Sequence, residues 1–181
     1  MSPQAAEPSP VATRYALLAI VLVASALRLP TLGTQSLWFD EAATWSQVEG
    51  TLGDLFIRTS ADNYPPLYNI LAWLAVQVLG DAEWVLRLPA ALLAVANVPL
   101  LYLLGRRIAG PSAGLLAAAL LALSAYHVWY SQEARMYSLL AFAATAYAWA
   151  AFDCWSSAGP GRRCCWLPPA PSSFTAILMV R

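Results

Sequence analysis

Long apolar runs, separated by short polar stretches, dominate the chain. Runs close to membrane-spanning length cover residues 11–29, 88–104, 113–130 and 136–152. A helix that crosses a bilayer needs roughly 20 predominantly apolar residues. The pattern therefore predicts an all-α protein with polytopic transmembrane helices, about four spans in number.

The region between the first and second predicted spans, residues 30–87, has a different pattern. Over residues 31–63 charged side chains are mixed with tryptophan and phenylalanine, which is typical of amphipathic helices at a membrane interface. The apolar stretch 66–79 has only about 14 residues, too few for a full span. We expect residues 30–87 to form an outer loop that carries interfacial helices.

Arginine positions orient these spans. If residues 66–79 do not cross, three arginine-bearing segments fall on one side of the membrane: Arg14, Arg106–Arg107 and Arg162–Arg163. Cytoplasmic segments carry an excess of Lys and Arg, so we expect a multi-pass protein of the cell membrane with a cytoplasmic N-terminus. If residues 66–79 did cross, Asp40 and Gln132 would lie on opposite faces, and the interfacial interpretation is favoured.

The two ends of the chain differ from its centre. Residues 1–10 are polar and contain prolines, which predicts a short disordered cytoplasmic tail. Residues 154–181 are rich in proline, cysteine and tryptophan and have no helical periodicity. We interpret them either as a truncated or frame-shifted end or as a short divergent tail, and residues 11–153 as the membrane module.

Composition narrows the classes of partner. The chain is 60% hydrophobic and 11% charged, and its ten basic and ten acidic residues give zero net charge. A small chain that is so apolar cannot bury all of its hydrophobic side chains in the core of a water-soluble domain. A lipid bilayer is therefore an expected partner, and there is no electrostatic case for nucleic acid.

Adjacent carboxylates follow the first predicted span. Asp40 and Glu41 come directly after Trp38 and Phe39. An acid at the membrane surface, shielded from water by aromatic rings, can become basic enough to accept a proton from a hydroxyl group. Asp40 and Glu41 are thus candidate catalytic residues. The alternative is that the pair caps a short amphipathic helix.

A second polar cluster, residues 126–137, joins the last two predicted spans. Arg135 can pair with Glu133 or bind a phosphate through its planar guanidinium. The alternative is an interfacial belt, in which aromatic rings anchor at the headgroups. The only histidine, His127, is left out of the catalytic set. The candidate substrate-binding residues of this cluster are Gln132, Glu133, Arg135 and Tyr137.

Together the polar motifs resemble GT-C type membrane glycosyltransferases, specifically the protein mannosyltransferase and aminoarabinose-transferase-like families. The resemblance covers about residues 11–153 and rests on four motifs in this order: Trp38-Phe39-Asp40-Glu41-Ala42, Tyr64-Pro65-Pro66-Leu67-Tyr68, Arg87-Leu88-Pro89-Ala90 and Ser131-Gln132-Glu133-Ala134-Arg135-Met136-Tyr137. It implies a glycosyltransferase that moves a hexosyl or pentosyl group from undecaprenyl or dolichyl phosphate to a glycan, lipid or protein acceptor, with inversion.

The resemblance also implies roles for single residues. Asp40 would be the catalytic carboxylate, either as a base toward the acceptor or as a ligand of a divalent metal ion, and Glu41 would support it. No other cofactor is implied. Similar enzymes often carry His or Lys near the lipid phosphate where this chain has Tyr64, so candidates for the phosphate contact by charge are Arg58, Arg87 and Arg135.

Two other classes remain as alternatives. A polytopic transporter or flippase usually has polar sites near the membrane midplane. Residues 88–104 and 113–126 carry almost no charge, and the ionisable residues cluster at one surface instead. The other alternative is a non-catalytic, truncated membrane protein, which the unusual tail favours.

Overall fold

The computed structural model describes residues 9–60 and 65–157. In these residues it has seven α-helices and no strand, so the predicted all-α class is confirmed for this part of the chain. The helices are α1 (Pro10–Arg28), α2 (Phe39–Val48), α3 (Leu52–Thr59), α4 (Leu67–Leu79), α5 (Glu83–Leu123), α6 (Ala125–Ser131) and α7 (Tyr137–Ser157).

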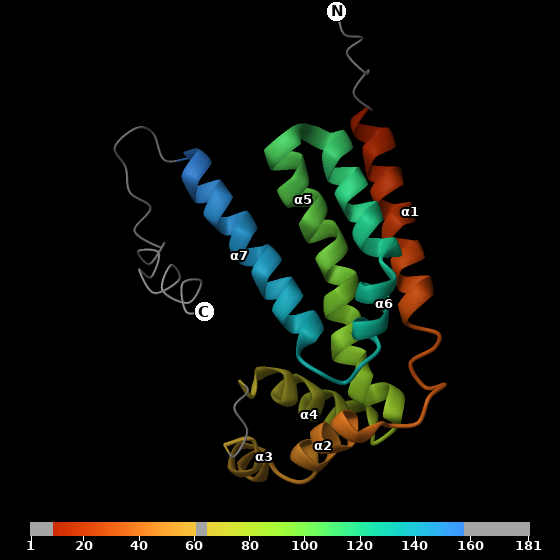
Figure 1. Ribbon diagram of the computed structural model, residues 1–181, viewed down its shortest axis with the longest axis vertical. Coiled ribbons are helices and arrows are strands. Elements are labelled where there is room, and N and C mark those ends of the chain that lie inside the picture. Colours follow the sequence, from red (N-terminus) through yellow and green to blue (C-terminus); the bar gives the residue numbers. More distant parts are fainter. Residues whose placement is uncertain (1–8, 61–64, 158–181) are drawn as a thin grey trace, which may run out of the picture.

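The helices form a column and a layer at one end of it. Helix α5 packs against both α1 and α7, and these three long helices make the column (Figure 1). Helices α2, α3 and α4 lie together below the column. The short apolar helix α4 therefore lies at the end of the column and not within it, as expected of an interfacial helix.

Helix α5 consists of two arms that run in opposite directions. The backbone leaves helical geometry at Ala109 and at Gly110, whose φ of 89° suits glycine. Pro111 follows, and proline is well tolerated in the first turn of the second arm. The arms approach closely, because a Cβ atom on Gly114 would lie 2.7 Å from the Tyr102 carbonyl oxygen.

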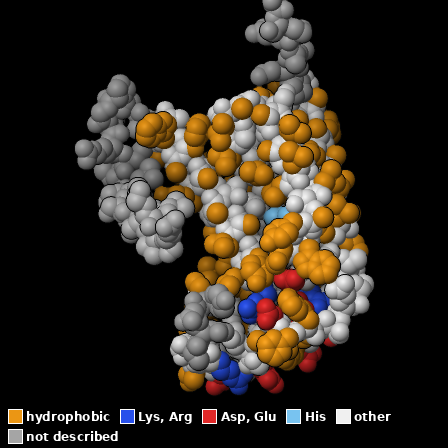
Figure 2. Space-filling view, viewed as in Figure 1, with side chains coloured by type: hydrophobic (Ala, Val, Ile, Leu, Met, Phe, Trp, Pro, Cys, Tyr) orange, Lys and Arg blue, Asp and Glu red, His pale blue; other side chains and the backbone are white. Residues whose placement is uncertain are grey.

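Two of the helices, α1 and α5, are long and apolar enough to cross a membrane. In α1 only 11% of the apolar window is buried inside the protein, so most of its hydrophobic side chains need lipid or another apolar partner. On the face seen in Figure 2, hydrophobic side chains spread over the column, whereas charged groups gather at its lower end. The count of four spans stays a prediction.

The predicted span over residues 113–130 was wrong in one respect, because it is not a continuous helix. Helix α5 ends at Leu123, and Ser124 has an extended ψ of 113°. The Ser124 hydroxyl then accepts a hydrogen bond from the backbone N–H of His127 and caps α6. A serine inside an apolar run gave too weak a signal to predict this break.

Arg28, which sequence reasoning did not single out, occupies the break. It is buried, and its guanidinium donates to four acceptors: the carbonyl oxygens of Ala24 (3.0 Å), Ala122 (3.1 Å) and Leu121 (3.3 Å) and Nδ1 of His127 (3.0 Å). Carbonyl groups at a helix C-terminus lack helical partners. Arg28 thus supplies donors where α5 stops and fastens α1 to α5 and α6.

A buried apolar core joins the lower layer to the column. It is made of Val48, Leu55, Tyr68, Ala72, Leu86, Ala90 and Ala134. Within it the Tyr68 hydroxyl donates to the Leu86 carbonyl oxygen at 3.0 Å, which links α4 to α5. The lower layer is therefore held in a defined position against the residues that connect α6 to α7.

Candidate functional site

A buried ion pair lies where the lower layer meets the column. Glu41 is in the first turn of α2, and Arg87 is near the start of α5. Arg87 Nε lies 2.7 Å from Glu41 Oε1, and Arg87 Nη2 lies 2.6 Å from Glu41 Oε2. The Glu41 side chain is only 1% exposed, and the Arg87 side chain is only 4% exposed. This bidentate geometry is the strongest form of an arginine–carboxylate contact.

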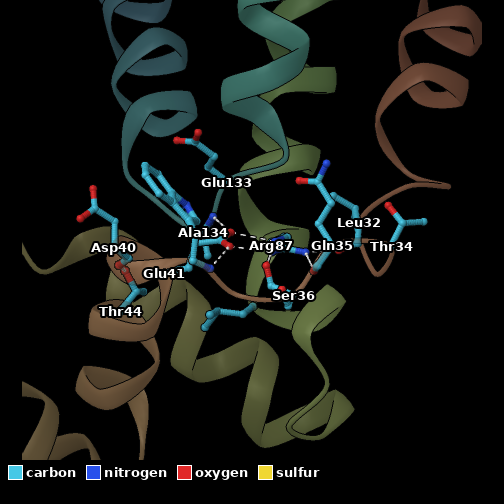
Figure 3. Close-up of polar contacts among 12 residues, drawn as sticks. Leu32, Thr34, Gln35, Ser36, Asp40, Glu41, Thr44, Arg87, Glu133 and Ala134 are labelled. Carbon is cyan, nitrogen blue, oxygen red and sulfur yellow. Dashed lines mark hydrogen bonds and ion pairs between the residues drawn. The ribbon is translucent and has the colours of Figure 1, made fainter.

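Arg87 also binds the loop that follows α1. Its remaining donors bind backbone carbonyl oxygens, at 2.7 Å for Leu32, 2.7 Å for Gln35 and 3.2 Å for Ser36 (Figure 3). A guanidinium has five N–H donors, and these contacts use all five. The structure therefore gives Arg87 a different role from the predicted phosphate contact, because no donor is left for a phosphate.

Glu41 joins a third segment to the same point. The backbone N–H of Ala134 donates to its Oε1 at 2.9 Å, and the backbone N–H of Trp38 donates to its Oε2 at 3.4 Å. The contact with Trp38 is the helix cap weighed as an alternative from the sequence. Because both oxygens are engaged, Glu41 is placed to position the loop and not to exchange protons with a substrate.

Asp40, the neighbour of Glu41, faces a different environment. Its side chain is 38% exposed, and its Oδ2 lies 3.9 Å from Arg135 Nη2. Arg135 Nη1 also approaches the Asp40 carbonyl oxygen at 3.5 Å. In Figure 3 the Asp40 carboxylate points away from the Glu41–Arg87 pair. The fold thus brings the acid motif beside Arg135, a residue 95 positions away.

A cavity of about 270 Å³ opens beside the buried ion pair. Its lining residues are Gln35, Ser36, Trp38, Glu41, Arg87, Trp129, Gln132 and Glu133. Glu133 Oε1 accepts a hydrogen bond from Trp129 Nε1 at 2.9 Å, whereas its buried Oε2 has no partner among the described residues. Burial raises the pKa of Glu133, and the nearby charges of Glu41 and Asp40 add to this.

The sequence of residues 63–158 matches a family model described as dolichyl-phosphate-mannose-protein mannosyltransferase. The chain belongs to this family. Comparison with curated proteins gave no match, and comparison with solved structures gave none.

The part of this mannosyltransferase-family chain that matches contains Arg87 and the whole 131–137 motif, but it begins after Asp40 and Glu41. Two ion pairs cross that boundary, one from Glu41 to Arg87 and one from Asp40 to Arg135. The acid motif outside the matched residues is therefore built into the same site as the matched motifs.

Two other residues that the sequence predicted for the mannosyltransferase-family chain, Gln132 and Tyr137, lie near the Glu41–Arg87 and Asp40–Arg135 pairs. The Gln132 side-chain amide donates to Thr31 Oγ1 at 2.6 Å and so ties the end of α6 to the exit of α1. The Tyr137 ring lies edge-on to that of Tyr130, with 4.8 Å between centroids. The structure supports a structural contact for each, and their predicted contacts with substrate stay predictions.

Arg58 does not join this cluster. The Arg58 guanidinium donates to the carbonyl oxygens of Ser46 and Glu49, and so closes the turn between α2 and α3. The predicted phosphate contact of Arg58 thus lacks support from its position. Tyr64 lies outside the described residues.

Asp40 is also the candidate ligand of a divalent metal ion. Within residues 9–60 and 65–157, no three side chains of His, Cys, Asp or Glu come together as a metal site. A magnesium-type ion commonly takes one or two carboxylates and completes its shell with water and phosphate oxygens. Asp40 fits that limited part, and the metal stays a prediction.

The Glu41–Arg87 pair is expected to make the stability of the mannosyltransferase-family chain depend on acidity. Burial alone would raise the pKa of Glu41, but hydrogen bonds from Arg87 and Ala134 and the Arg87 charge outweigh it, so the pKa is lowered. A lowered carboxyl pKa gives stability that is fully present above the ordinary value of about 4.3 and is lost as pH falls through the folded value.

Thermal unfolding in detergent, followed from pH 7 to pH 3, measures this effect. The unfolding temperature should hold above about pH 5 and fall below about pH 4. Glu41→Gln should be less stable at neutral pH and lose this part of the slope. An unchanged slope in Glu41→Gln would show that other carboxyl groups cause the acid dependence.

Proposed function

We propose that the chain transfers a sugar from a polyprenyl phosphate to a hydroxyl group of a glycan, lipid or protein acceptor. Its family supports glycosyl transfer from a lipid-linked donor. The observation that carries the proposal is the position of Asp40, half-exposed and 3.9 Å from the Arg135 guanidinium, at the end of an apolar helical column. A carboxylate and a cation thus lie beside each other at the end where we expect a lipid phosphate to meet the protein.

In the proposed reaction Asp40 accepts the proton of the acceptor hydroxyl. The acceptor oxygen forms a bond to the anomeric carbon as the bond from that carbon to the phosphate oxygen breaks. The electron pair leaves with the polyprenyl phosphate, and attack from the opposite side inverts the anomeric centre. Arg135 is near enough to Asp40 to stabilise the negative charge that develops on the phosphate.

The arrangement of apolar and charged surface also favours a lipid-linked donor. Exposed hydrophobic side chains on α1, among them Tyr15, Leu18 and Leu22, suit contact with acyl chains. On the face shown in Figure 2, charged groups gather at the lower end of the column. A donor whose isoprenoid tail lies in the bilayer would present its phosphate at that end, which we place on the outer face of the cell membrane, opposite the cytoplasmic N-terminus.

The proposal is tested by donor choice. Purified chain in liposomes receives the same radiolabelled sugar either on polyprenyl phosphate or as a nucleotide sugar, with hydroxyl acceptors from a membrane extract. We expect transfer only from the lipid phosphate, with release of free polyprenyl phosphate. Transfer only from the nucleotide sugar, or no transfer from either, would contradict the proposal, and empty liposomes give the background.

A further inference from the structure

Helix α6 lacks the buried apolar side chains that usually fix the position of a helix. Among its seven residues only Ser131 is buried. Two cavities border it, one of about 270 Å³ beside the Glu41–Arg87 pair and one of about 250 Å³ that it shares with α7. Close packing against neighbours leaves little freedom to an element in a protein core. Because α6 is packed less completely, its position has to depend on polar contacts.

The first of these contacts joins His127 to Arg28, the buried arginine at the end of α1. Arg28 Nη2 lies 3.0 Å from His127 Nδ1. A guanidinium group only donates, so Nδ1 accepts, and the neutral imidazole carries its proton on Nε2. The other three acceptors of Arg28 are carbonyl oxygens of α1 and α5. His127 is therefore the described residue through which this guanidinium holds α6.

The second contact is at the other end of α6, where Gln132 is the C-cap residue. Its side-chain amide donates to the carbonyl oxygens of Leu27 (3.1 Å) and Arg28 (3.4 Å) and to Thr31 Oγ1 (2.6 Å). Both ends of α6 are thus tied by hydrogen bonds to the same few residues at the exit of α1.

The segment that follows α6 brings Arg135 beside Asp40. Arg135 is four positions after the last residue of α6. Its Nη2 lies 3.9 Å from Asp40 Oδ2, whereas a charge-assisted hydrogen bond is about 2.7–2.9 Å long. So long and partly exposed a contact stabilises little by itself. Its geometry depends on the contacts that place the segment, which include the two ties of α6 and the hydrogen bond from the Ala134 N–H to Glu41 Oε1.

We propose that His127 is a positioning residue for sugar transfer. By accepting a hydrogen bond from Arg28 it fixes α6, and through α6 it places the Arg135 guanidinium beside Asp40. The proposal rests on the proposed function, in which Arg135 stabilises the charge on the leaving phosphate. In this role His127 holds the helix and takes no part in the bond changes. A displacement of about 1 Å can slow a reaction about a hundredfold.

Two substitutions separate the hydrogen bond from the rest of the side chain. His127→Leu removes the acceptor, so α6 loses its tie to Arg28, while the contacts of Arg28 with the α1 and α5 carbonyl oxygens stay. His127→Asn keeps an acceptor near the position of Nδ1, because the side-chain oxygen of Asn branches from the same carbon. Ala125→Leu is the matched control, since it adds a leucine at an exposed position of the same helix.

Hydrogen exchange of residues 132–136, followed by mass spectrometry of the full chain in detergent, measures this placement without turnover. The Ala134 amide is a direct reporter, because its hydrogen bond holds the segment to α2. Exchange should be about tenfold or more faster in His127→Leu and stay near the wild-type rate in His127→Asn and Ala125→Leu. Unchanged exchange in His127→Leu would overturn the proposal. So would an equal increase in α4, because the substitution would then loosen the whole fold.

Kinetics connect the placement to transfer. His127→Leu should lower kcat about 10–100-fold with little change in KM, because Arg135 acts on charge that develops only in the transition state. When Arg135→Met has already removed the guanidinium, His127→Leu should cause no further loss. An equally large loss in that background would overturn the proposal. The expected exchange in a wild-type chain that transfers no sugar would instead overturn the proposed function and leave the placement of Arg135 by His127 standing.

Discussion

Arg87→Met is expected to lower the free energy of unfolding by about 3–5 kcal/mol. The change leaves the Glu41 carboxylate buried, at 1% exposure, without its counter-ion. It also removes the donors that the Leu32, Gln35 and Ser36 carbonyl oxygens now use. For a chain of this size the loss corresponds to a fall in unfolding temperature of roughly 6–20 °C, measured by circular dichroism in detergent.

Arg106→Met provides the matched control, since Arg106 is an exposed arginine on the same helix. Its effect should stay within about 0.5 kcal/mol. The double variant Glu41→Leu/Arg87→Met should recover part of the loss, because it removes both buried charges together. If Arg87→Met unfolded at the wild-type temperature, the pair would not be what holds α2 and the loop before it to α5.

Asp40→Asn is expected to have the opposite profile, with a large loss of transfer and little loss of stability. If Asp40 is the base, removing its proton-accepting charge should slow transfer by about 10²–10⁴-fold. Its partly exposed pair with Arg135 spans 3.9 Å, and such pairs contribute only about 0–1 kcal/mol. The rate is measured as sugar transferred from polyprenyl phosphate by the liposome-bound chain, beside the unfolding temperature of the same preparation.

The control for Asp40→Asn is Asp81→Asn, which changes an exposed aspartate between α4 and α5 and should leave transfer unchanged. Asp40→Glu should keep part of the activity, because it retains a carboxylate at a slightly different reach. Full transfer by Asp40→Asn would exclude Asp40 as the base. A comparable loss of transfer and of stability would make Asp40 a structural residue.

Much of the fold followed from local patterns in the chain. Apolar runs of helical length and the short stretch 66–79 identified most helices, because helix formation depends on neighbouring residues and on one apolar face. The break at Ser124 did not follow from them. It depends on Arg28, which reaches the carbonyl oxygen of Ala122 from 94 positions away, and a sequence pattern carries no record of such a contact.

In the site, too, some features could be predicted from the sequence and others depended on tertiary contacts. From the sequence alone came the all-helical class, the family resemblance and the expectation that Asp40 and Gln132 share one face of the membrane, because each rests on residue types, spacing and apolar runs along the chain. Tertiary structure decided what each charged group does. Successive residues in a helix point about 100° apart, so packing against α5 buried Glu41 on Arg87, 46 positions away, and left Asp40 at the surface.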